Sequence, residues 1–305
     1  LYISAGREFN EFASDAYIDS GTGYSFAFTS DFHPWAIVEP IGITDDELVI
    51  IESKDLIGNV DVFDLILVDD EWMQVGFVQL DSNENIASIF VSRGVFDTVP
   101  VAHLGDSDGV VVKFVESYAA SDDIEYSASE SVNVKLRTTI GSSILDEDDA
   151  PTNTVVFDSR AIRPYPAGNL KVDGLSYPES YTWTGDHFLT WEGRDRIVQA
   201  DVGFGHFQSG GVGEDGTTYR IEGYAYVGDS TVEEQFLYTD VGDALSWGFD
   251  SNVSEVDSNM GFPPEDSRRI VLRVVAQRDG YDSWQSPEVE FQVPPFTDSV
   301  GDSNN

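Results

Sequence analysis

Short apolar runs divided by polar breaks are the feature that most limits what this chain can fold into. Between residues 44 and 115 these runs are ELVIIE, VDVFDLILVDD, EWMQVGFVQL, ASIFVSRG and GVVVKFV. They are rich in Val, Ile and aromatic residues, which are typical of strands, and turn-forming groups such as DSNEN separate them. Strands that follow one another this closely predict a small β-barrel or a folded meander, because closure removes exposed sheet edges.

A second all-β pattern occupies residues 163–295. It begins with RPYPAGNLKVDG, in which two prolines hold the backbone extended. The apolar run in DHFLTWEGRDRIVQ and the alternation in TTYRIEGYAYV predict two further strands. IVLRVVAQRDG and SPEVEFQV predict a closing hairpin. We therefore expect a β-sandwich, and because no stretch has a clear helical period, we expect little helix.

The remaining segments flank these two units. Residues 1–43 are aromatic-rich and irregular, which indicates an arm with little regular structure beyond a strand. Residues 116–162 contain alternating apolar positions on both sides of an acidic loop, and predict a β-hairpin linker. Residues 296–305 are almost all polar or small and predict a flexible tail. The small β domain is thus expected at 44–115 and the sandwich at 163–295.

The charge of the chain limits its partners. There are 56 acidic and 16 basic residues, so the formal net charge is −40. Such a charge repels nucleic acid and anionic membranes, and no apolar run is long enough to span a bilayer. Two interpretations of the acidity remain open: a surface suited to saline surroundings, or loops that bind divalent cations. The best candidate for calcium is the turn with Asp106 and Asp108, although it lacks the other ligands of an EF-hand loop.

No catalytic arrangement is recognisable, so we expect a protein without enzymatic activity and without a cofactor; calcium is the one candidate ion. The chain has no cysteine, which excludes disulfides and thiolate chemistry. Residues 211–216, GVGEDG, match a dinucleotide-binding string, but a strand pattern follows them where a helix is required, and we expect a flexible hairpin loop. Arg194 and Arg196 alternate with Asp195, and we expect the two arginines to pair with carboxylates or loop carbonyls. The histidines have no metal-binding spacing; they are His33, His103, His187 and His206.

Two motifs, in this order, resemble those of tailed-bacteriophage tail proteins. The first is RGVFDTVPVAHLG, which closes a small β domain and contains Arg93, Gly94, Thr98 and His103. The second is the series RPYPAGNLKVDG, LTWEGRDRIVQ, TTYRIEGYAY and QRDGYDSWQSPEVEF, which is similar to a fibronectin type III-like domain of the same proteins. The matching residues of this series are Trp191, Arg194, Arg196, Arg278, Asp279, Gly280 and Trp284.

The resemblance implies an all-β chain in which a small β-barrel or meander precedes a fibronectin type III-like sandwich. It implies a non-enzymatic structural protein of the virion, in the tail tip, baseplate or fibre. Expected partners are other tail proteins, further copies of the chain as a trimer or hexamer on the tail axis, and a receptor or glycan on the host surface. The loops at Gly203–Gly216 and Phe249–Ser267 are where we expect host contact, because long loops on a rigid scaffold often bind.

Two other classes of function fit the composition. A carbohydrate-binding module or adhesin would stack exposed aromatic rings on sugars, and the candidates are Trp183, Trp247 and Trp284. A glycan-degrading enzyme of the tail would need two carboxylates facing one cleft. Tryptophan-dependent glycan binding would indicate the first, and turnover lost on a single Asp or Glu substitution would indicate the second.

Overall fold

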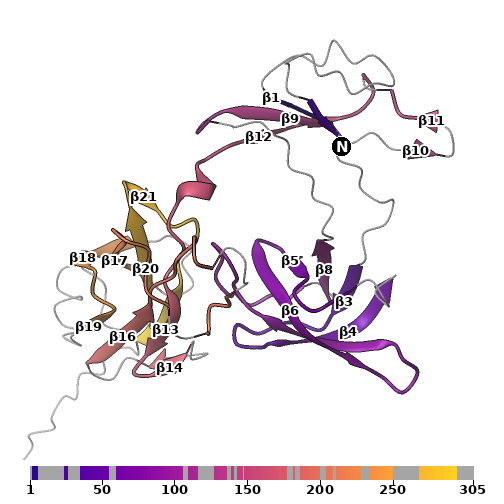
Figure 1. Cartoon of the computed structure of the whole chain (residues 1–305). Coiled ribbons are helices and arrows are strands. Elements are labelled where there is room, and N and C mark those ends of the chain that lie inside the picture. Colours follow the sequence, from indigo (N-terminus) through magenta and orange to yellow (C-terminus); the bar gives the residue numbers. More distant parts are fainter. Residues whose placement is uncertain are drawn as a thin grey trace, which may run out of the picture.

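The computed structural model describes residues 2–5, 24–26, 35–54, 60–105, 109–115, 127–135, 139–140, 143–146, 148–176, 181–182, 186–199, 204–208, 211–227, 234–249 and 268–293. These residues form a β-barrel, a β-sandwich and a separate small sheet (Figure 1). A short 3₁₀ helix, Arg160–Ile162, lies between the small sheet and the sandwich. Within the described part of the chain, no helix has the length and hydropathy that a bilayer span requires.

The first domain is a closed barrel with the strand order β3-β4-β7-β6-β5-β8. Its strands are β3 (Trp35–Val38), β4 (Glu47–Lys54), β5 (Leu65–Val68), β6 (Glu71–Leu80), β7 (Ile86–Ser92) and β8 (Val110–Val115). Alternate side chains point inward and are fully buried, among them Leu48, Ile66, Met73, Ile89 and Val112. The barrel begins before the expected boundary at residue 44, because β3 pairs with both β4 and β8 and so closes the sheet.

The second domain is a sandwich of two sheets with the orders β14-β13-β16-β19 and β15-β22-β20-β17-β18, and β21 pairs with β20. The strands are β13 (Gly168–Val172), β14 (Leu175–Ser176), β15 (Tyr181–Thr182), β16 (His187–Glu192), β17 (Thr218–Val227), β18 (Glu234–Gly242), β19 (Ser246–Phe249), β20 (Arg268–Arg278), β21 (Tyr281–Asp282) and β22 (Glu288–Val293). Trp191 from one sheet packs edge-on against Tyr219 from the other, with 5.7 Å between ring centroids. The prediction of an all-β chain with a small barrel and a fibronectin type III-like sandwich is confirmed.

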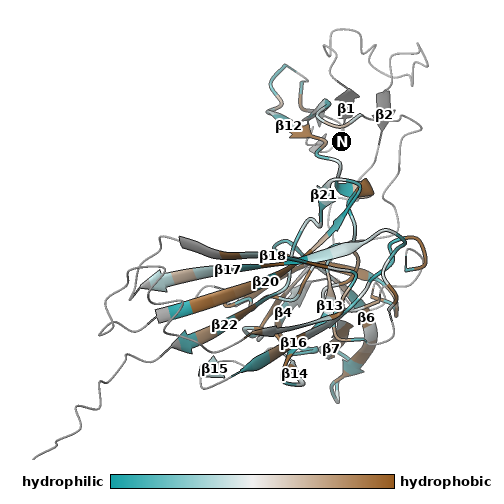
Figure 2. Ribbon diagram, turned by 90° about the vertical axis from the view of Figure 1, so that its left-hand side faces the viewer, coloured by the Kyte–Doolittle hydropathy of each residue, from teal (hydrophilic) through white to brown (hydrophobic). Residues whose placement is uncertain are grey.

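A third sheet joins segments that are far apart in the sequence, with the order β12-β9-β1-β2. Its strands are β1 (Tyr2–Ala5), β2 (Tyr24–Phe26), β9 (Ser131–Lys135) and β12 (Thr152–Val156), and a hairpin of β10 (Thr139–Ile140) and β11 (Ser143–Ile144) lies beside it. The sequence predicts a separate arm and a separate hairpin linker here. Instead β1 pairs with the free side of β9, so arm and linker form one sheet that stands clear of both domains in two views (Figures 1 and 2).

Candidate functional site at the joint between barrel and sandwich

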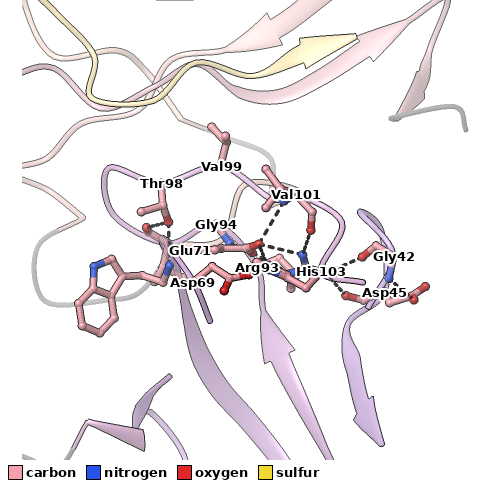
Figure 3. Close-up of polar contacts among 12 residues, drawn as sticks. Gly42, Asp45, Asp69, Glu71, Arg93, Gly94, Thr98, Val99, Val101 and His103 are labelled. Atoms are coloured by element: carbon pink, nitrogen blue, oxygen red, sulfur yellow. Dashed lines mark hydrogen bonds and ion pairs between the residues drawn. The ribbon is translucent and has the colours of Figure 1, made fainter. Parts of the chain in front are cut away.

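Most motif residues of the two domains meet at one place, the joint between the barrel and the sandwich. The centre of the joint on the barrel side is Arg93, which directly follows β7 and is 2 % exposed. Its partner is Glu71, the first residue of β6, which is 1 % exposed (Figure 3). Nε of Arg93 lies 2.7 Å from Oε1 of Glu71, and Nη2 lies 2.8 Å from Oε2.

The rest of the Arg93 guanidinium binds backbone carbonyls. Nη1 donates to the carbonyl oxygens of Gly42 at 2.8 Å and Asp45 at 2.7 Å, and Nη2 donates to that of Val101 at 2.7 Å. All five N–H groups of the guanidinium therefore have an acceptor. Gly42 and Asp45 lie in the loop between β3 and β4, and Val101 lies in the segment between β7 and β8, so one side chain ties two loops together at the end of the barrel that faces the sandwich.

His103 completes this charged cluster. Its Nε2 lies 2.9 Å from Glu71 Oε2 and its Nδ1 lies 2.8 Å from Asp69 Oδ2, so the doubly protonated ring, which donates from both nitrogens, fits the site. Burial acts to lower the pKa of His103, but the bonds to Glu71 and Asp69 raise it above its ordinary value. Burial acts to raise the pKa of Glu71, and the bonds from Arg93 and His103 outweigh it, so this pKa lies below its ordinary value.

The segment that follows Arg93 folds back over the cluster. Gly94 has a φ of 57° and donates its N–H to Glu71 at 2.9 Å. A Cβ atom at Gly94 would lie 2.6 Å from Cδ of Pro100, so this position has room for glycine alone. Thr98 accepts the N–H of Trp72 through its hydroxyl at 3.1 Å. The RGVFDTVPVAHLG motif is thus a folded cap on the barrel end.

Arg194 reaches this cap from the sandwich. It is 4 % exposed, and it donates to the carbonyl oxygens of Thr98 at 3.2 Å and Phe204 at 2.9 Å. Its guanidinium lies 5.4 Å from the ring centroid of Tyr165, within cation–π range. Arg194 follows strand β16, which ends at Glu192, and the chain turns there. That turn is what directs the side chain toward the barrel.

His206 lies between the two domains and is fully buried. Its backbone N–H donates to the carbonyl oxygen of Arg93 at 2.7 Å, and its own carbonyl accepts the N–H of Asn169 at 2.7 Å. Ring atom Nε2 accepts the N–H of Leu170 at 3.4 Å. Burial lowers the pKa of His206 well below its ordinary value, and the positive charge of Arg194 lowers it further. The joint therefore holds one histidine that favours the cation and one that favours the neutral ring.

Amide side chains add further bonds across the joint. Gln285 accepts the N–H of Val99 at 2.8 Å and donates to the carbonyl of Asp70 at 3.1 Å, so one side chain of the sandwich binds two loops of the barrel. Gln208 donates to the hydroxyl of Ser92 at 3.2 Å. Gln285 belongs to the QRDGYDSWQSPEVEF motif, whereas no pattern in the sequence marks Gln208. In neither case does the sequence show what the amide faces.

The 3₁₀ helix is fixed to the same joint. Arg160 forms an ion pair with Asp97 of the barrel, in which Nη2 lies 2.9 Å from Oδ1. The guanidinium groups of Arg160 and Arg163 lie 5.1 Å and 5.8 Å from the ring centroid of Trp284. Trp284 is 41 % exposed, but these two cations already lie over its ring.

The remaining charged motif residues meet around Glu214. Nε of Arg196 lies 2.9 Å from Glu214, and Arg278 forms a second ion pair with it. Asp279 and Gly280, with φ of 51° and 82°, form the turn between β20 and β21. Within residues 211–216, for which the sequence predicts a flexible hairpin loop, Gly211 and Gly213 pack closely against Gly193. A Cβ added at Gly193 would lie 2.1 Å from the backbone nitrogen of Gly213.

Other predicted residues lie apart from the joint. Trp191 belongs to the sandwich core, and Trp247 packs beside Phe249 with 5.2 Å between ring centroids. His187 binds Asp173 at 2.7 Å near the start of β16. Several predicted features lie outside the described residues: His33, Asp106, Asp108, Trp183 and residues 296–305. The predicted loop Phe249–Ser267 also lies outside them, except for Phe249 itself.

No group of three or more His, Asp or Glu side chains among the described residues could hold a metal ion. A hollow of about 430 Å³ is lined by Asp195, Glu214 and Asp215 with Ile197, Val198 and Val212. Two of these acids are already bound, since Glu214 pairs with arginines and Asp195 accepts two backbone N–H groups. The arrangement at the joint fixes one domain against the other.

Comparison with known proteins gives little further guidance. No family model matches the chain, and no curated protein matches it. Among solved structures, the chain is similar to the FN1–FN3 domains of chicken CNTN1, with 9 % identity and a TM-score of 0.21. The match covers 86 % of this chain and 66 % of that structure, which is slightly less than two thirds of its length. A TM-score this low bears on neither family nor function.

Proposed function

We propose that the chain is a non-enzymatic structural component of a tailed-phage tail, in the tail tip, baseplate or fibre. The observation that carries this proposal is the convergence of two motifs that are separate in the sequence. RGVFDTVPVAHLG supplies Arg93 and Thr98, and LTWEGRDRIVQ supplies Arg194, which binds the carbonyl of Thr98. Residues that resemble those of phage tail proteins are therefore the residues that join the two domains.

The role of the joint in a tail would be mechanical. A tail component has to keep its modules in a fixed orientation while it transmits contact from the host surface to the rest of the particle. Here the orientation depends on bonds to backbone groups, from His206, Arg194 and Gln285, which leave little freedom to rotate. Inter-domain interfaces are otherwise expected to permit relative motion. The two domains would act as one rigid spacer that presents its loops.

The test is whether the chain belongs to phage particles and where it lies on them. Antibodies raised against the purified chain would be applied to tailed particles from the same source and located by immunogold electron microscopy. We expect label confined to the tail, and peptides of the chain in the mass spectrum of purified particles. Peptides absent from purified particles, or label on the head alone, would contradict the proposal.

Host contact is the part of this proposal that depends on the loops. We expect the loop that follows Phe249 to meet a receptor or glycan, because Gly203–Gly216, the other loop expected to do so, supplies His206 and Glu214 to the contacts described above. Replacing residues 250–267 by a short glycine-serine linker should reduce adsorption of the phage to its host. Unchanged adsorption would remove host contact from the proposal and leave the assembly role. A glycan array read with Trp247→Ala would separate this role from that of a carbohydrate-binding module.

A further inference from the structure

The hollow beside Glu214 is lined by the most exposed apolar side chains that the structure describes. Val212 is 82 % exposed and Val198 is 75 % exposed, the two largest values among the large apolar residues described, and Ile197 is 70 % exposed. Single exposed apolar side chains are common on protein surfaces, whereas several around one hollow mark a place where another molecule binds. Its volume of about 430 Å³ is at the small end of the range for binding sites. We call it the apolar hollow.

Ile197 and Val198 are held in place by a hydrogen-bonded turn. Their backbone N–H groups both donate to Oδ1 of Asp195, at 2.8 Å and 3.1 Å. Gln199 donates its N–H to the carbonyl oxygen of Asp195 at 2.9 Å, which closes one helical turn, and Gln199 itself is only 7 % exposed. Arg196, which precedes the two apolar residues, is fixed by an ion pair of 2.9 Å. The two apolar side chains therefore extend from a turn that is anchored at both ends.

The segment that carries Val212 is held just as closely. Gly211 and Gly213, on either side of it, pack against the backbone of Gly193. A Cβ added at Gly211 would lie 2.0 Å from the carbonyl oxygen of Gly193. Glu214, the next residue along the chain, is buried and pairs with two arginines. Because both segments are ordered before anything binds, a ligand of this hollow would lose little free energy to ordering them.

Acidic groups border the apolar side chains. Asp215 is exposed, and Asp195 is half-buried. Both N–H bonds to the Asp195 carboxylate go to Oδ1, and no described residue bonds to Oδ2. These two carboxylates attract a cation, and the net charge of −40 adds to the attraction over longer distances. The same charge repels a second copy of the chain, nucleic acid and anionic lipid.

We infer that the apolar hollow is a docking site for an extended segment of another protein, in which apolar side chains stand beside lysine or arginine. The apolar side chains of that segment would cover Ile197, Val198 and Val212, and its cation would pair with Asp195 or Asp215. Apolar contact then supplies the affinity, and the charges fix the orientation. The inference goes beyond the proposed tail role and does not depend on it, because the hollow and its charge belong to the chain in any setting.

Three short capped peptides that differ only in charge test the inference: RLLR, GLLG and ELLE. Each would be titrated into the full chain labelled at the methyl groups of isoleucine and valine, and the methyl NMR signals would be followed. We expect RLLR to shift the signals of Ile197, Val198 and Val212, with a dissociation constant of about 1 mM. At low salt RLLR should bind about three- to fivefold more tightly than GLLG, and ELLE more weakly than either. High salt should remove most of the difference.

Two pairs of matched variants locate the site. Val212→Thr keeps the shape of the side chain but replaces a methyl group by a hydroxyl, and should weaken RLLR binding about threefold. Val111→Thr makes the same change at a 55 % exposed position on the barrel and should leave binding unchanged. Asp215→Asn should reduce the preference for RLLR over GLLG, whereas Asp243→Asn, at an exposed acid that does not line the hollow, should not. All four positions are exposed, so the thermal midpoints should change little.

Each other outcome would overturn the inference. Shifts of equal size at Val111 and at Val212 would show that the peptide binds apolar surface without a site. Equal affinities for RLLR and ELLE, or tighter binding of GLLG, would mean that the hollow takes a neutral apolar ligand. Signals that move with protein concentration in the absence of peptide would place a second copy of the chain in the hollow. Binding that is unaffected by both Val212→Thr and Asp215→Asn would move the site elsewhere.

Discussion

Arg93 and Glu71 face each other through two parallel hydrogen bonds, 2.7 Å and 2.8 Å long, in a place where each side chain is 1 % exposed. A buried pair of this kind contributes little net stability when it is intact, because removing two charges from water costs about as much as their attraction returns. Breaking it is different, since the remaining charge stays buried without a partner. The folded barrel end therefore depends on both residues being present.

Arg93→Ala should lower the free energy of unfolding by about 3–5 kcal/mol, because Glu71 would remain as a buried charge without its main partner. Arg93→Lys should also destabilise the barrel, since an ammonium cannot replace a planar group with five donors. Urea unfolding followed by tryptophan fluorescence measures both. Arg269→Ala is the matched control. Nη1 of Arg269 lies 3.5 Å from Oε2 of Glu290, and both side chains are about 40 % exposed, so we expect the free energy of unfolding to fall by only about 1 kcal/mol. Equal losses for Arg93 and Arg269 would contradict this account.

Part of this cluster could be predicted from the sequence and part could not. Glu71 lies among three consecutive acids, which suggests a solvated surface. Yet Glu71, Met73 and Val75 share one face of β6 by simple alternation, and all three are buried. An acidic residue that shares the buried face of a strand predicts a buried charge, and a buried charge needs a cationic partner. Its partner Arg93 is marked only by the resemblance, because residues that follow a strand have no periodicity.

The relation between segments was harder to predict than the segments themselves. The strand patterns predict both domains because alternation is a local property. The pairing of β1 with β9 places Ile3 opposite Val134, and no local sequence pattern specifies this pairing. The same holds for Gln285, which binds Val99 of the other domain. Contacts of this kind depend on how whole domains dock.

The raised pKa of His103 gives the barrel end a dependence on pH. A group whose pKa is raised on folding adds stability that is complete below its unfolded value, here 6.5, and is lost as pH rises through the folded value. The stability difference between the natural chain and His103→Gln should therefore shrink as pH increases from about 6 to 9. Urea midpoints across this range measure it. The lowered pKa of Glu71 acts only at acidic pH, below its unfolded value of 4.5, so it does not interfere. Parallel pH profiles for the two proteins would rule this effect out.

His206 should show the opposite behaviour. Because its pKa is lowered on folding, its contribution is present above the unfolded value of 6.5 and is lost as pH falls below it. Histidine resonances in NMR spectra, assigned with His206→Gln and His103→Gln, measure both groups in one titration. At pH 6.5 we expect His206 to be neutral and His103 to be charged. A His206 resonance that titrates near 6.5 would show that the ring is not buried in the joint.

Gly94→Ala should be much more harmful than a similar change elsewhere. Its φ of 57° strains any side chain, and an added Cβ would lie 2.6 Å from Pro100. We expect a loss of about 2–4 kcal/mol in unfolding free energy from strain and crowding together. Gly174 has a φ of 85° with nothing within 4 Å of an added Cβ, so Gly174→Ala isolates the conformational part at about 1–2 kcal/mol. Comparable thermal midpoints for the two variants would contradict the crowding at Pro100.

Arg194→Ala should separate the unfolding of the two domains. The side chain bonds to the buried carbonyl of Thr98 in the barrel and to the partly buried carbonyl of Phe204 in the sandwich, so its removal takes this donor from both sides of the joint. In scanning calorimetry we expect the natural chain to unfold its domains together and the variant to show two resolved transitions. The variant should also raise the pKa of His206 toward its ordinary value, because Arg194 supplies a positive charge that lowers it.

The matched control for this last prediction is Arg196→Ala. Arg196 bonds to Glu214 and to the carbonyl of Ala161, and neither belongs to the barrel. We expect this variant to lose some stability in the sandwich while the two domains still unfold together. Two resolved transitions in Arg196→Ala, or a single transition in Arg194→Ala with an unchanged His206 titration, would mean that the domains are coupled through the backbone bonds of His206 and the amide of Gln285, without help from the arginine.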